Sequence, residues 1–156
     1  MCTSLRPGVK WINDLVVNGK KLAGILTELQ LTPDGHVEYA ICGIGVNCAG
    51  VPAEVRDIAT SILDETGCET DLSRLAVAMV RCMTDACDSV KDPVHMEKYR
   101  KNCVTLGKTV SVLGKDEYEA TALDVDDDGA LLVSVDGQVR RVFSGEVSVR
   151  GLFGYV

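Results

Sequence analysis

Two adjacent lysines, Lys20 and Lys21, follow an Asn-Gly pair and precede the apolar run LAGIL at 22–26. Successive side chains of a strand point to opposite faces, so one lysine faces solvent and the other faces inward. An inward lysine is costly unless an anion pairs with it, and Asp14 lies across the predicted hairpin as that partner. The segment therefore indicates an inward lysine that is paired with a carboxylate across the hairpin.

Glycines accompany these charges at positions where a strand normally carries a side chain. Gly24 leaves its backbone open to a ligand, and Gly43 and Gly45 form a second glycine pair on the neighbouring predicted strand. Asn47 follows, and its carboxamide offers both a donor and an acceptor, which suits the edge of a nucleobase. The same residues also fit a surface ion pair with strand glycines at bulges, so the residues alone leave two interpretations open.

The first segment that must position these residues, 9–47, reads as strands. Its short apolar runs are separated by turn signals at Asn18-Gly19 and at Pro33-Asp34-Gly35, which predicts an antiparallel meander. The runs are apolar at nearly every position. We therefore expect helices to cover at least one face of this sheet.

The middle of the chain has helical spacing. Helices are predicted at 53–59, from Asp71 onward, and at 94–102. Met79 and Met83 fall on the apolar stripe of the long helix. We expect them to fill a core rather than to bind a ligand.

The segment from residue 107 onward again reads as strands. Four or five short runs, separated by Asp- and Gly-rich turns, predict a small barrel or sandwich. The run Asp126-Asp127-Asp128-Gly129 lacks the spaced acids and the closing glutamate of a calcium loop. A tight turn with solvated carboxylates is the expected structure.

Composition narrows the class of protein. The chain has 156 residues and a net charge of −7, with no basic run, so nucleic acid is not an expected partner of this segment. It has no apolar run long enough to span a membrane and no signal peptide, so no membrane partner is expected. The seven cysteines have irregular spacing and contain no C-x-x-C. They predict neither a disulfide framework nor a zinc site, and a cytoplasmic location is expected.

Four ordered motifs resemble those of biotin–protein ligases. They are K-W-x-N-D at 10–14, K-L-A-G-I-L-x-E at 21–28, G-x-G-V-N at 43–47 and G-E-V-S-V-R at 145–150. One departure is Ile12, which stands where the family usually has proline; that proline shapes a turn, so we expect little functional effect. The resemblance covers nearly the whole chain.

The resemblance implies an α+β fold. Residues 1–104 would be the C-terminal portion of a class II synthetase-like catalytic domain, a mostly antiparallel sheet with packing helices. Residues 105–156 would form a small SH3-like β-barrel. The implied reaction activates biotin with ATP and Mg²⁺ to biotinyl-5′-AMP, then transfers biotin to a lysine of a biotin carboxyl carrier protein. No bound prosthetic group is expected.

The resemblance also implies roles for individual residues. Lys21 would contact the biotin carboxylate and the α-phosphate, and Asp14 would orient Lys21 or help to hold Mg²⁺. The remaining implied residues are Lys10 and Asn13 at the nucleotide and its phosphates, Asn47 at the adenine, Gly43 and Gly45 at the adenylate, Gly24, Ile25 and Leu26 against the rings of biotin, and Glu146 and Arg150 reaching the nucleotide from the barrel.

One family feature is missing from the sequence. The glycine- and arginine-rich loop G-R-G-R-x-G-R, which closes over biotin in this family, is not found, and Lys10 lies only ten residues into the chain. We therefore expect the second half of a truncated ligase, inactive alone, self-associating through an open sheet edge or complemented by an upstream half. The alternatives are a lipoate–protein ligase and a non-catalytic module that binds adenylate or carrier.

Overall fold

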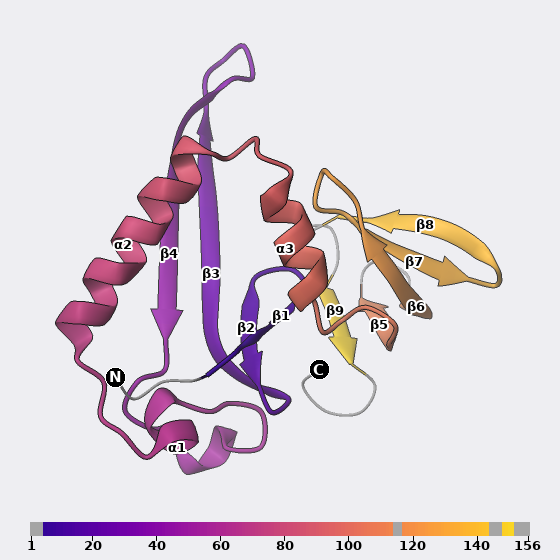
Figure 1. Ribbon diagram of the computed structural model, residues 1–156. Helices are drawn as coiled ribbons and strands as arrows, with labels where there is room; N and C mark the ends of the chain where they lie inside the picture. Colours follow the sequence, from indigo (N-terminus) through magenta and orange to yellow (C-terminus); the bar gives the residue numbers. More distant parts are fainter. Residues whose placement is uncertain (1–4, 114–116, 144–147, 152–156) are drawn as a thin grey trace.

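The computed structural model describes residues 5–113, 117–143 and 148–151, which form two antiparallel sheets and three α-helices (Figure 1). The first sheet contains β1 (Gly8–Lys10), β2 (Asp14–Val17), β3 (Lys20–Leu31) and β4 (Val37–Val46), paired in that order. Asn18 and Gly19 both have positive φ, 49° and 76°, as a tight hairpin turn requires. The predicted meander is confirmed.

The β3–β4 hairpin is much longer than the other two strands and projects past the helices (Figure 1). No residue of β4 is buried, and Leu29, Tyr39 and Ile41 are each more than half exposed. The expectation that helices cover this sheet is wrong for the outer half of the hairpin. Its side chains stay exposed because the tip of the hairpin extends past the helices (Figure 1).

The helical segment differs in part from the prediction. It contains a single 3₁₀ turn (Ala53–Val55), α1 (Ile62–Thr66), α2 (Leu72–Asp88) and α3 (Val94–Asn102). Asp71 caps α2 by accepting a hydrogen bond from the Arg74 amide at 3.0 Å, so the long helix and the last helix are confirmed.

The predicted helix over 53–59 is wrong beyond its first turn, and α1 was not predicted. Ile58 ends a hydrogen-bonded turn, and Ala59 then forms a parallel bridge with Lys21. The Lys21 amide donates to the Ile58 carbonyl and the Lys21 carbonyl accepts from the Thr60 amide, both at 2.9 Å. Ser61 then caps α1, since its hydroxyl accepts from the Asp64 amide. Tertiary pairing with β3 overrides the local helical signal here.

The second sheet contains β5 (Thr109–Leu113), β6 (Tyr118–Val125), β7 (Leu131–Val135), β8 (Gln138–Val142) and β9 (Ser148–Gly151), in the order β8-β7-β6-β5-β9. Alternate residues point into a core in which Val112, Ala122, Leu131 and Val133 have no exposed surface. The prediction of a small all-β unit is confirmed, and with the helices it gives the predicted α+β class.

The acidic turn between β6 and β7, residues 126–129, is tight but not fully solvated. Asp126 accepts hydrogen bonds from the amides of Asp128 and Ala130 and pairs with Arg141 at 2.6 Å. Burial alone would raise the pKa of Asp126, but the Ala130 amide and Arg141 outweigh it and hold that pKa below its ordinary value. Solvated carboxylates are the right prediction only for Asp127 and Asp128, which are 90% and 76% exposed.

Trp11, from the loop after β1, packs in the same core as Val110 and Leu131 of the second sheet. A residue of the first predicted domain thus completes the hydrophobic cluster of the second. The division at 104/105 therefore stays a prediction. Across the described ranges, no helix is long and apolar enough to cross a membrane.

Candidate active site

Lys21 and Asp14 form an ion pair at the inner end of the first sheet. Lys21 Nζ lies 2.6 Å from Asp14 Oδ1, with the lysine side chain 39% and the aspartate side chain 17% exposed. They line a cavity of about 670 Å³ between the start of β2 and the facing parts of β3 and β4. The pair predicted from sequence is present, and it stands at an open, partly polar surface.

A β-bulge gives Lys21 its direction. Asp14 pairs with Gly24 and Leu15 with Ala23, but Val16 pairs with Lys21, so Leu22 is an extra residue on β3. Leu22 and Ala23 consequently point to the same face, while Lys21 and Gly24 share the opposite face. Without the bulge, strict alternation would place Lys21 and Gly24 on opposite faces.

Gly24 provides the room in which the ion pair lies. A Cβ at this position would stand 3.1 Å from Asp14 Oδ1, from Lys21 Cε and from Lys21 Nζ. These distances are tighter than ordinary van der Waals contact, so any side chain here would push the lysine and the carboxylate aside. The glycine that sequence analysis assigned to a ligand wall also makes space for the charges.

The backbone around the pair is held from several directions. The Asn13 side chain donates to the Ile25 carbonyl, and the Ile25 amide donates to the Asn13 carbonyl at 2.9 Å. The Lys20 ammonium donates to the Arg56 carbonyl at 2.6 Å and therefore points away from Lys21 toward the segment before α1. The two adjacent lysines thus have different surroundings, as the alternation argument predicted.

Asn47 joins the end of β4 to β3 and to residue 60. Its side-chain amide donates to the Thr60 carbonyl at 3.0 Å and to the Lys21 carbonyl at 3.4 Å, and its backbone amide donates to the Leu22 carbonyl. Its amino group is therefore already used to hold the strand that carries Lys21. The predicted role at the adenine stays a prediction.

The structure gathers most of the predicted site residues around one cavity. Those that line it are Asn13, Asp14, Lys21, Gly24, Ile25, Leu26, Gly43, Gly45 and Asn47. Lys10 is buried on β1, where its backbone pairs with Asp14, and is not among the lining residues. Arg150 lies in β9 with its backbone paired to Ser111, and Glu146 lies outside the described residues.

Two residues not predicted from the sequence, Ile58 and Thr60, hold the backbone of Lys21. Neither residue type carries a local signal for this role, because the contact is made through backbone groups of a segment far along the chain. The signal that existed was the polar pair Thr60-Ser61, which is buried and fully hydrogen-bonded, but it was not recognised.

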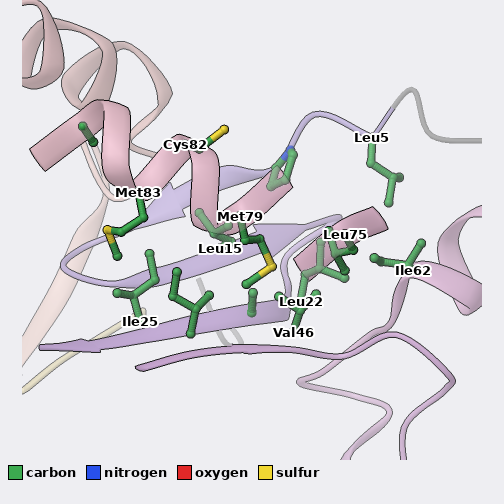
Figure 2. Close-up of a pocket in the computed structure, with 14 residues that line it drawn as sticks. Leu5, Leu15, Leu22, Ile25, Val46, Ile62, Leu75, Met79, Cys82 and Met83 are labelled. Atoms are coloured by element: carbon green, nitrogen blue, oxygen red, sulfur yellow. The ribbon is translucent and has the colours of Figure 1, made fainter. Parts of the chain in front are cut away.

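The opposite face of the sheet forms an apolar groove of about 430 Å³ beneath α2. Figure 2 shows Met79 and Met83 extending from the helix toward the strands that carry Leu22, Ile25 and Val46. No residue of α2 is buried, so the prediction that these methionines fill a core is wrong: they line a groove that is not filled. The groove and the polar cavity lie on the two faces of the same strands.

Two family models match the chain. Residues 7–47 match the Biotin/lipoate A/B protein ligase family, and residues 105–150 match the Biotin protein ligase C terminal domain. The first match defines the class, protein ligases for biotin or lipoate, and contains the Lys21–Asp14 cavity. The second match, over an SH3-like domain, narrows that class to the ligases for biotin.

Curated relatives and solved structures agree with these matches. The biotin–[acetyl-CoA-carboxylase] ligase of Mycobacterium tuberculosis is 33% identical over 90% of this chain and 52% of its own length. The bifunctional ligase/repressor BirA of Bacillus subtilis is 29% identical over 93% of this chain and 47% of its own length. The chain thus spans about half the length of the curated relatives it matches.

Among solved structures, apo biotin protein ligase from Aquifex aeolicus superposes with a TM-score of 0.82 at 25% identity, over 96% of this chain and 67% of that one. The same ligase in complex with biotin and ATP gives a TM-score of 0.81, over 96% of this chain and 64% of that one. The chain belongs to the biotin protein ligase family.

Proposed function

We propose that this protein carries the adenylation site of a biotin–protein ligase, which activates biotin with ATP and transfers it to a lysine of a biotin carboxyl carrier protein. The observation that carries the proposal is the Lys21–Asp14 pair above Gly24 in an open polar cavity. The Aquifex aeolicus neighbour solved with biotin and ATP supports these substrates.

In the first step a biotin carboxylate oxygen attacks the α-phosphorus of ATP. An O–P bond forms, the bond between the α-phosphorus and its bridging oxygen breaks, and pyrophosphate leaves. Both reactants are anions, so the step needs a fixed cation where they meet. Lys21 supplies that cation on a flexible stem, and Asp14 keeps its ammonium in place at 2.6 Å.

In the second step a carrier lysine amine attacks the carbonyl carbon of the mixed anhydride. A C–N bond forms, the C–O bond to the phosphate breaks, AMP leaves, and the amine releases a proton to solvent. The wide mouth of the cavity would let an extended carrier loop reach the adenylate. Asn47 would meet the adenine through its carboxamide oxygen, because its amino group already bonds to backbone carbonyls.

Mg²⁺ would enter with the nucleotide. Among the described residues, no group of three or more metal-binding side chains is present. The site offers one carboxylate, Asp14, and one carboxylate suits a metal held mainly by phosphate oxygens and water. The metal would neutralise phosphate charge, while Lys21 orients the attacking carboxylate.

We also propose that this chain alone has little turnover and that a further polypeptide segment improves it. The support is the open cavity on one face of the sheet and the unfilled groove on the other, since adenylation benefits from closure over the substrates. A cytoplasmic location is proposed because the six described cysteines are all free thiols.

The test is biotin-dependent ATP–pyrophosphate exchange by the purified chain, alone and mixed with the upstream half of the Mycobacterium tuberculosis relative. Lys21→Ala should lower exchange at least about 100-fold, because a cation acting on the developing charge is lost. Lys20→Ala is the matched control and should stay within about twofold, because Lys20 bonds to the Arg56 carbonyl outside the cavity.

Other outcomes separate the alternatives. Exchange that depends on lipoate instead of biotin would replace the proposal with a lipoate–protein ligase; the match to the biotin ligase C-terminal domain argues against this. Binding of biotinyl-5′-AMP in calorimetry without exchange under either condition would indicate a non-catalytic module. Equal loss in the two lysine variants would remove the special role of Lys21.

A further inference from the structure

Trp11 and Ile12 form a corner that leads directly into the candidate site. Ile12 is followed by Asn13 and Asp14, which line the polar cavity. The corner itself belongs to a different environment: the Trp11 side chain is 5% exposed and packs in the core of the second sheet. The two residues therefore connect the core of the second sheet to the polar cavity within four positions of sequence.

Hydrogen bonds from the C-terminal half of the chain fix this corner. The Trp11 amide donates to the Thr105 hydroxyl at 2.9 Å, and its indole Nε1–H donates to the Gly129 carbonyl at 3.0 Å. The Tyr99 hydroxyl donates to the Ile12 carbonyl at 2.9 Å. Burial raises the pKa of Tyr99, which keeps this donor protonated at any physiological pH.

Arg100, next to Tyr99 on α3, holds the turn that receives the indole. Its Nε donates to the Val125 carbonyl, and its guanidinium pairs with Asp127 and lies 3.8 Å from Asp124. The Arg100 side chain is 28% exposed, whereas that of Asp127 is 90% exposed. An ion pair with so exposed a partner contributes little stability by itself. The hydrogen bond from Arg100 to the Val125 carbonyl therefore does more to fix the position of the turn.

We infer that Arg100 and Trp11 are positioning residues for the adenylation site: through the 126–129 turn they fix the place of Asn13 and Asp14 relative to Lys21. The inference rests on the proposed function. Asp14 is the first residue of β2, so its distance to Lys21 depends on the position of the preceding residues, Trp11 and Ile12. Hydrogen bonds from α3 and from the second sheet's turns hold these two residues, and we call this set of bonds the clamp. If the 126–129 turn moved, the Trp11 indole bonded to it would move too, and the Asp14 carboxylate would be displaced from Lys21.

Arg141 offers a matched control. It binds the same acidic turn through two carboxylates, at 2.6 Å to Asp126 and 2.7 Å to Asp128, so its chemistry resembles that of Arg100. It stands on β8, however, and links the turn only to the barrel's own sheet. Losing Arg141 disturbs the same turn without loosening its link to α3.

The experiment compares Arg100→Gln with Arg141→Gln in the full chain by amide hydrogen exchange and by calorimetric titration with biotinyl-5′-AMP. Arg100→Gln should speed exchange in peptides covering residues 9–17 and weaken adenylate binding by roughly threefold to tenfold. Arg141→Gln should leave both within about twofold. Exchange in the β3–β4 hairpin should not change in either variant, which separates local loosening from general loss of stability.

A second variant covers the case in which Arg100→Gln does not fold. Asp127→Asn alters only an exposed partner of Arg100 and should shift exchange at 9–17 in the same direction by a smaller factor. Equal effects of the two arginine variants, or unchanged exchange at 9–17 in folded Arg100→Gln and in Asp127→Asn, would overturn the inference. If wild type does not bind the adenylate, the proposed function fails for this chain, while the exchange comparison still decides whether the clamp exists.

Discussion

The two sheets bury their side chains to very different degrees. In the second sheet Val112 and Leu131 have no exposed surface, whereas in the first sheet no residue of β4 is buried and Ile41 is 57% exposed. The second sheet curls around its own core, with Trp11 added from the first half of the chain. The first sheet offers a polar cavity on one face and an apolar groove on the other. Stability is thus concentrated in one region and chemistry in the other.

Truncating one apolar residue in each region would test this comparison with the largest expected effect. Leu131→Ala should lower the free energy of unfolding by about 2–5 kcal/mol, because it leaves a cavity in a closed core. Ile41→Ala should change it by less than about 0.5 kcal/mol, because the side chain is already in solvent. Urea denaturation followed by the fluorescence of Trp11, the single tryptophan, measures both. Equal losses would mean that the hairpin is packed after all.

Two glycines that face each other across β3 and β4 give an intermediate effect. Gly24→Ala should cost about 1–3 kcal/mol, because its Cβ would meet Asp14 and Lys21 at 3.1 Å. At Gly45, its cross-strand partner, a Cβ would meet no atom within 4 Å, so Gly45→Ala should cost less than about 0.5 kcal/mol. Thermal unfolding without ligand measures the difference. A neutral Gly24→Ala would show that the ion pair can move at no cost.

The smallest effect concerns acid stability of the barrel. The pKa of Asp126 is held below its ordinary value of 3.8, so the folded state binds this proton less readily than the unfolded state. The stabilisation is present above the ordinary pKa and is lost as pH falls through the lower, folded value. The unfolding temperature of Asp126→Asn should therefore fall less than that of wild type between about pH 5 and pH 2.

The matched control for this measurement is Asp88→Asn at the end of α2, which removes the same charge from a helix outside the barrel. The comparison separates the effect of the turn from the effect of removing one negative charge elsewhere. Parallel curves for wild type and Asp126→Asn would mean that the turn's hydrogen bonds do not favour the charged carboxylate.

The parts of the fold that follow from local sequence were predictable. The Asn18-Gly19 turn, the Asp71 cap and the strands of the second sheet all depend on residues within a few positions of one another. The bridge that Ala59 forms before α1 was not predictable, because it depends on pairing with the backbone of Lys21. Local propensity says nothing about a partner so far along the chain.

The candidate site was predictable in membership more than in geometry. Lys21, Asp14 and Gly24 were identified from charge, spacing and the absence of a side chain. The extra residue at Leu22 was not, because a bulge is visible only when both strands are aligned. Lys10 shows the opposite case: its motif position indicated the site, but its side chain is buried away from the cavity lining.

The bulge at Leu22 has a consequence for how this segment can evolve. The bulge decides which face of β3 each side chain points to. The polar and apolar faces of the strand therefore depend on the number of residues between Lys21 and Gly24 as well as on their types. Deleting Leu22 would remove the bulge and leave Lys21 two positions before Gly24, so regular alternation would keep both on the cavity face. Lys21 would turn toward the groove beneath α2 only if Leu22 stayed and paired in place of Lys21 with Val16, although no charged residue had been replaced. Two residues between Lys21 and Gly24 therefore require the bulge, whereas a single residue would not, so the number of residues and the strand register must change together.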